Sequence, residues 1–385
     1  MKKSHLIKTI IFATVFIIFS LLFFMAQNVE ESIRQHNSHL EYNRARIIEI
    51  VADHTIIRND SDIQDETLAN LRQGTVVFNI EVLRGRFSGE ILEANYHMHS
   101  PMHIDFEVGD VVSVRIFEFD GEIMITEIRY PERTQIVFIL IGIFLLFLCI
   151  IGGKKGIQSV LGLVFTLICV ITLLIPLIVQ GYPVILITLI ILALVSAVTI
   201  ILLAGLSAKG VAAILGTMSG VLISALFAQI SGILLHINGY NIANYRALAH
   251  LADASGISGL FISSVLVAAI GAIMDSCMSV ASAMEEVYHA DKTITAQKLF
   301  KSGFNVSRDV MGTMSSTLIL AFIGGSLAMM IFMYATRVSF NQLMNSDMIA
   351  IEIIMGISGS IGIILAAPFT AIIATKLMTM DKTKD

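Results

Sequence analysis

The sequence predicts a polytopic α-helical membrane bundle that carries one small all-β domain. Of the 385 residues, 56% are hydrophobic and 14% are charged, whereas about a quarter of an ordinary globular chain is charged. Eight runs of about 18 or more apolar residues are long enough to cross a bilayer as helices. Between the first and second runs lies a polar segment whose apolar residues alternate as in β-strands.

The eight predicted spans are residues 7–26, 135–152, 157–179, 183–206, 211–235, 257–284, 311–335 and 348–375. The first span follows two lysines and has no clear Ala-x-Ala cleavage site, so we interpret it as an uncleaved anchor rather than a signal peptide. The predicted domains are a membrane anchor (1–29), an extracytoplasmic β domain (30–133), a seven-span membrane domain (134–376) and a cytoplasmic tail (377–385).

The distribution of Lys and Arg predicts that both termini are cytoplasmic. With the N-terminus inside, thirteen basic residues fall on the cytoplasmic side and only Arg246 and Arg337 fall in short outer loops. This bias follows the positive-inside rule. The other ten basic residues, all Arg, lie in the segment between the first two spans, which is long enough to be translocated whatever its charge.

The extracytoplasmic segment predicts a small barrel of the OB or SH3-like kind. Alternating stretches at 46–58, 75–83, 111–119 and 122–128 are separated by Gly-containing turn signals, and about five short antiparallel strands fit the space. Residues 30–43 are expected to form a helical linker. This fold class serves many ligands, so it specifies none.

Neither a cofactor nor a metal site is predicted. The tract from Tyr96 to His103 contains three His and two Met residues, and such side chains bind soft or borderline metal ions. A solvated hairpin loop in which the three His residues are incidental is the favoured interpretation, and we assign no site to the tract. The cysteines, Cys149, Cys169 and Cys277, all fall in predicted spans, which indicates neither a disulfide framework nor a zinc site.

Asp275 is the strongest functional signal in the sequence, because a carboxylate in the middle of an apolar span costs several kcal/mol and normally faces a partner or a water-filled cavity. Helical spacing places it on one face with five small or hydroxyl residues. They are Ala268, Gly271, Ala272, Ser279 and Ser282.

A second polar group lies on the seventh predicted span, at Thr313, Ser315, Ser316 and Thr317. Counting about 1.5 Å per residue from the cytoplasmic side, Ser316 or Thr317 would lie at the depth of Asp275. Two interpretations follow. Asp275, with Ser279 and these hydroxyls, lines a transport pathway; or its carboxyl only bonds neighbouring helices together, a contact worth about 0.6 to 2 kcal/mol.

Two stretches carry a family resemblance. They are Gly271-Ala-Ile-Met-Asp275-Ser-Cys-Met-Ser279-Val-Ala-Ser282-Ala and Arg308-Asp309-Val-Met-Gly312-Thr-Met-Ser315-Ser-Thr-Leu-Ile. Both resemble the signature of YibE/F-like bacterial membrane proteins, and the similarity extends from about residue 156 to 373. The anchor and β domain resemble the long members of that family. The resemblance implies a multipass protein of the bacterial plasma membrane, regarded as a candidate permease without a defined substrate.

The favoured functional hypothesis is a secondary transporter or permease for a small solute or ion, proton-coupled through Asp275. The alternative is a membrane scaffold whose β domain binds an envelope protein or a second membrane protein. We do not expect an enzyme, because Asp275 is the only acid clearly in mid-span and no zinc-type or serine-type catalytic motif is present. Apart from the lipid bilayer, no partner is specified; no nucleic acid is expected, and the oligomeric state is left open.

Overall fold

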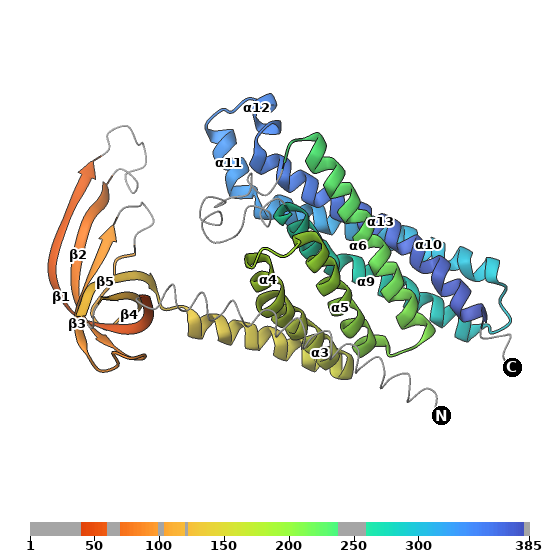
Figure 1. Cartoon of the computed structure of the whole chain (residues 1–385), viewed down its shortest axis with the longest axis horizontal. Helices are drawn as coiled ribbons and strands as arrows, with labels where there is room; N and C mark the ends of the chain where they lie inside the picture. Colours follow the sequence, from red (N-terminus) through yellow and green to blue (C-terminus); the bar gives the residue numbers. More distant parts are fainter. Residues whose placement is uncertain (1–39, 60–69, 99–103, 120–121, 238–258, 381–385) are drawn as a thin grey trace. The chain divides into compact units, whose positions relative to one another are not determined.

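The computed structural model describes residues 40–59, 70–98, 104–119, 122–237 and 259–380. It divides into two compact units, one that ends at Leu146 and one that continues from Phe147. The predicted first span (7–26) lies outside the described residues, as does most of the His-Met tract. Figure 1 shows the strands in one unit and the long helices in the other.

The first unit is a closed five-stranded barrel with the strand order β1-β2-β3-β5-β4. Its strands are β1 (Leu40–Asn59), β2 (Asn70–Val82), β3 (Ile91–Met98), β4 (Val111–Phe119) and β5 (Glu122–Pro131). Alternate residues point inward: Phe78 and Ile80 of β2, like Val112 and Val114 of β4, are almost completely buried. This alternation confirms the prediction of a small β barrel.

Three details of the barrel differ from the prediction. Residues 40–43, expected in a helical linker, begin strand β1. Strand β3 was not predicted, because Tyr96 and His97 were assigned to a loop. Not all strands are antiparallel: β3 and β5 pair in parallel at Asn95 and Glu127.

The described chain after the barrel is helical, and the boundary between the two units falls within its first helix. After the barrel follow α3 (Thr134–Cys169), the π-helical turn η1 (Val170–Leu174), α4 (Ile175–Val179), α5 (Val184–Ala204), α6 (Ala208–Leu234), α9 (Leu260–Ala290), α10 (Ala296–Gly325), α11 (Leu327–Ala335), α12 (Phe340–Met344) and α13 (Asp347–Met380). In the described part, five helical segments are long and apolar enough to cross a membrane, or six if α10 and α11, bent by 55°, form one span. The predicted count of eight therefore stays a prediction.

Two of the predicted spans, 135–152 and 157–179, correspond to α3 together with η1 and α4. The α3 helix is kinked at Gly153, whose backbone leaves the helical region (φ 55°, ψ −132°). A Cβ added to the nearby Gly156 would clash with the carbonyl oxygen of Leu148. The kink therefore stands where the sequence predicted the short connection between two spans.

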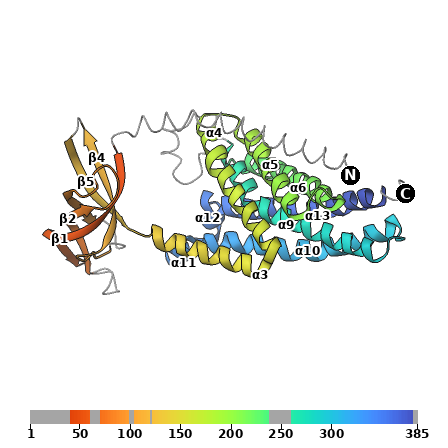
Figure 2. The ribbon, with the colours of Figure 1, turned by 90° about the horizontal axis from the view of Figure 1, so that it is seen from below.

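Helix α13 lies at the centre of the helical unit and packs against α6, α9 and α10, while α9 also contacts α5, α6 and α10. Figures 1 and 2 both show α6, α9 and α13 side by side. At one end of this bundle Lys209 of α6 forms an ion pair with Glu285 of α9 at 2.5 Å. The predicted loop 285–308 is mostly helical, because α9 continues to Ala290 and α10 already begins at Ala296.

Helix starts in this unit have local explanations. The Ser207 hydroxyl accepts a hydrogen bond from the Gly210 amide at 3.1 Å and caps α6. The Thr295 hydroxyl accepts one from the Lys298 amide at 3.4 Å and caps α10. Such caps satisfy amides that have no partner in the first turn of a helix, so they define where α6 and α10 begin.

Candidate functional site

Asp275 lies on an exposed stripe of α9. Four exposed residues recur at the three- and four-residue spacing of one helical face. They are Ala268, Gly271, Asp275 and Ser279. Ala272 and Ser282, predicted on the same face, are half-buried. The opposite face of α9 is closed: Ala269, Ile273 and Cys277 are buried.

The neighbouring helix α10 exposes a similar stripe. Gly312, Thr313, Ser316 and Thr317 are exposed, whereas Ser315 is buried. Ser315 faces α13, since its backbone carbonyl accepts a hydrogen bond from Ser360 at 3.4 Å. At about 100° per residue, Thr313 and Thr317 lie roughly 160° around the helix from Ser315, so both project away from α13.

The two stripes lie on the same side of the α9–α10 pair. On α9, Ile273 faces α13, because a Cβ added to Gly362 of α13 would lie 2.9 Å from the Ile273 side chain. At 100° per residue, Asp275 projects about 160° away from Ile273. We call the exposed surface formed by both stripes the polar face. It consists of Ala268, Gly271, Asp275 and Ser279 of α9 and Gly312, Thr313, Ser316 and Thr317 of α10.

Two close contacts set the register of α9 against α10. A Cβ at Gly303 would meet the side chain of Met284, and a Cβ at Gly359 of α13 would meet both Leu318 and Ala269. Both contacts give the same antiparallel register. Asp275 lies nine residues before Met284 on α9, and Gly312 lies nine residues after Gly303 on α10. Asp275 is therefore level with Gly312, and Ser316 and Thr317 lie about one turn further along α10.

No hydrogen bond or ion pair reaches the Asp275 carboxylate within the described part of the chain. The nearby hydroxyls donate to their own helix instead: Thr313 to the Val310 carbonyl at 3.1 Å, Ser316 to Gly312 at 2.9 Å and Thr317 to Thr313 at 2.9 Å. Each hydroxyl oxygen keeps lone pairs that accept a hydrogen bond or bind a cation. Among the described residues, Asp275 therefore does not form the interhelical hydrogen bond that a purely structural role would require.

A second polar cluster is buried between α6, α9 and α13, and sequence reasoning did not identify it. A Cβ added to Gly216 would clash with the Thr370 hydroxyl and lie 3.3 Å from the Cys277 sulfur, so these three residues are packed together. Ser224 of α6 and Ser358 of α13 are fully buried and their hydroxyls have no hydrogen-bond partner. Only the packing of three helices brings these residues together.

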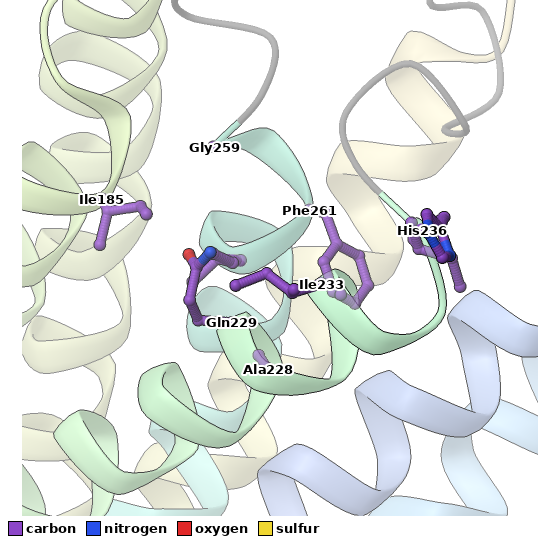
Figure 3. A pocket seen from close by; sticks show the side chains of 10 residues that line it. Ile185, Ala228, Gln229, Ile233, His236, Gly259 and Phe261 are labelled. Carbon is purple, nitrogen blue, oxygen red and sulfur yellow. The ribbon is translucent and has the colours of Figure 1, made fainter.

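A cavity of about 320 Å³ lies between the ends of α5, α6 and α9. Figure 3 shows Gln229, Ile233 and Phe261 around it, with His236 to one side. Its wall is otherwise apolar, and its volume is at the lower end of those that hold small ligands. No sequence pattern predicts this cavity, because its lining residues come from three separate segments.

Comparison with known proteins gives one match. A family model described as YibE/F-like protein matches residues 140–380, which is more than half of the chain and includes the polar face and the buried cluster. Neither the curated proteins nor the solved structures contain a significant match.

Proposed function

The chain belongs to the YibE/F-like family, and from this premise we propose that it is a membrane permease whose solute or ion passes along the polar face. The observation that carries the proposal is the position of Asp275: its carboxylate is exposed on a membrane-length helix and has no partner among the described residues. A carboxylate at bilayer depth is costly unless it contacts a partner, an ion or water.

The polar face supplies oxygen atoms at two levels. Asp275 lies at the level of Gly312 and Thr313, and Gly271 lies at the level of Ser316 in the same register. Glycines at these places leave room beside the oxygens, because a Cβ added to Gly271 or Gly312 would meet nothing within 4 Å. Carboxylate and hydroxyl oxygens suit hard cations and protons.

Proton coupling follows from the hydrogen bonds of the hydroxyls. Thr313 and Thr317 already donate to backbone carbonyls, so toward Asp275 they can only accept. A protonated Asp275 can donate to such an oxygen, whereas the ionised carboxylate cannot, and it attracts a cation or water instead. The two protonation states of one residue thus favour two different occupants of the face.

The proposed topology places both termini in the cytoplasm and the barrel outside the cell. It rests on the thirteen Lys and Arg residues that fall on one side of the spans. The ion pair between Lys209 and Glu285 then marks the cytoplasmic end of α6 and α9, and the cavity near His236 opens toward the outer end.

The experiment uses the purified full chain in liposomes that contain a pH-sensitive dye, with monovalent cations, divalent metal ions and amino acids added outside in turn. We expect at least one class to drive proton movement with the wild type, and Asp275→Asn to slow it by at least about tenfold. Glu352→Gln is the matched control, since it removes another carboxylate from a membrane-length helix. An unchanged Asp275→Asn rate, or equal loss with Glu352→Gln, contradicts the proposal.

A specific observation favours a second candidate, a scaffold that binds an envelope protein through the barrel. Its strand order and parallel β3–β5 pairing support an OB-type barrel. Beyond Ile47, β2 is the one described strand that pairs with β1, and Ile50, Val51 and Ile56 are exposed on this stretch. An open apolar strand edge can accept an added strand from a partner. This reading predicts that deletion of residues 30–133 abolishes function while Asp275→Asn does not.

A further inference from the structure

The long helices expose surfaces of two chemically different kinds. The first half of α3 exposes almost only large apolar side chains, such as Phe138, Leu140 and Ile150, which suit lipid. The polar face exposes Gly, Ser, Thr and Asp instead. Lipid chains offer no hydrogen bond to a carboxylate and no close fit to small side chains, so this face is poorly suited to lipid.

We propose that the neighbour of the polar face is a second copy of this chain, with α9 of each copy packed against α10 of the other around a two-fold axis along the membrane normal. The inference stands on the membrane helices and does not depend on transport. Such an axis brings together residues at equal depth. Asp275 of one copy therefore meets Gly312 and Thr313 of its partner, and the same contact is repeated on the other side of the axis.

The fit of small residues supports this arrangement. In the interior of one chain, glycines have neighbours: a Cβ at Gly220 would lie 2.6 Å from the Ala366 Cβ, and one at Gly362 would lie 3.0 Å from the Gly220 oxygen. At Gly271 and Gly312 nothing lies within 4 Å. Small residues in membrane helices allow backbones to approach closely, and no described segment of the same chain provides the other backbone at Gly271 and Gly312.

The predicted anchor fits this position poorly. Residues 10–25 include five Phe and only two hydroxyl residues, Thr14 and Ser20, and no charge. A second copy instead brings hydroxyl oxygens to the depth of the carboxylate, and it places Gly312 opposite Asp275 and Gly271 opposite Ser316. Both sides of the contact are then polar and small, which is the complementarity that an unpartnered intramembrane acid requires.

Thiol cross-linking in membranes tests the arrangement. One tagged copy carries Gly271→Cys and a differently tagged copy carries Ser316→Cys, both with Cys149→Ala, and the two are co-expressed. The register places positions 271 and 316 at the same depth, so a short bifunctional maleimide should join the two tags in one band. Because each copy has only one introduced thiol, a link between the tags cannot form within a chain.

The matched control replaces Gly271→Cys by Leu222→Cys. Leu222 is 55% exposed on α6, and the contacts of Gly216 with Cys277 and of Gly220 with Ile273 place it level with Gly271, but on an apolar face. We expect at least about tenfold less product with this pair. Equal products, or a Gly271 product that links only to another protein, would overturn the proposal.

A measurement on the unmodified chain covers the case in which the cysteine variants misfold. Light scattering of the detergent-solubilised wild type should give the mass of two chains, that is, twice 42.0 kDa. Asp275→Leu, which makes the face apolar, should shift the mass toward one chain. A wild type that is monomeric at all concentrations would exclude the second copy, whatever the outcome of the transport assay.

Discussion

The inner interface of α6, α9 and α13 and the outer polar face of α9 and α10 are built from the same residue types but face different surroundings. Glycine, alanine, serine and threonine dominate both. In the inner interface every gap beside Gly216, Gly220 and Gly362 is filled by a side chain or backbone atom of the same chain. Beside Gly271 and Gly312 the space is open. Composition alone therefore does not distinguish a finished interface from one that awaits a partner.

The largest expected effect comes from filling the inner interface. Gly220→Leu forces side-chain atoms into Ala366, Ile273 and the Gly362 carbonyl, and we expect a loss of about 3 kcal/mol or more in the free energy of unfolding. Circular dichroism during thermal unfolding in detergent measures it. Gly271→Leu is the control, measured at a dilution at which copies of the chain are separate: it meets nothing in the described part of its own chain, and Leu is the better helix former, so we expect no loss of stability. Similar destabilisation by both variants would contradict the contrast between the two regions.

A smaller effect should come from the buried hydroxyls of the inner interface. Ser224 is fully buried and its hydroxyl has no hydrogen-bond partner, so Ser224→Ala removes a desolvated polar atom and should stabilise the chain by about 1 kcal/mol. The same thermal unfolding measurement applies.

Ser276→Ala is the matched control for Ser224→Ala. The Ser276 side chain is equally buried, but its hydroxyl donates to the Ala272 carbonyl at 2.8 Å, so its removal should bring no gain. If Ser224→Ala destabilises the chain instead, its hydroxyl has a partner, and the inner interface is less dry than its packing indicates.

Much of the fold could be predicted because hydrophobic patterns are local. Alternation identified four of the five strands, and apolar runs located the membrane-length helices. The unpredicted strand β3 has the same pattern, with Leu92, Ala94, Tyr96 and Met98 alternating with polar residues, but its His and Met side chains are equally typical of a metal-binding loop. The parallel β3–β5 pairing was beyond reach, because it depends on how distant strands close the barrel.

The site could be predicted only as far as one helix. The periodicity of α9 correctly placed Asp275 and Ser279 on one face, since helical spacing is fixed by backbone geometry. The sequence did not predict that α10 begins as early as Ala296, nor its register against α9. It therefore matched Asp275 with Ser316 or Thr317 instead of Gly312 and Thr313. Which face is covered depends on packing between helices, and this information is not local.

The smallest expected effect concerns Asp53, a carboxylate that, unlike Asp275, has partners among the described residues. On β1 of the barrel, the Thr55 hydroxyl donates to Asp53 at 2.6 Å, and this bond, with Arg72 nearby, lowers the pKa of Asp53 below its usual value. A lowered folded pKa contributes stability above the unfolded value of about 3.9 and loses it as the pH falls through the folded value.

Amide hydrogen exchange of β1 and β2, corrected for the intrinsic rate, should therefore show less protection at about pH 3 than at pH 6, by less than about 1 kcal/mol because Asp53 and Arg72 are partly exposed. Asp53→Asn should remove this pH dependence, and Thr55→Val should reduce it because it deletes the main donor. If Asp53→Asn keeps the full dependence, another group controls it. The hydrogen bond and ion pair of Asp53 would then not cause the pH dependence of protection, and Asp53 could not serve as the comparison for Asp275.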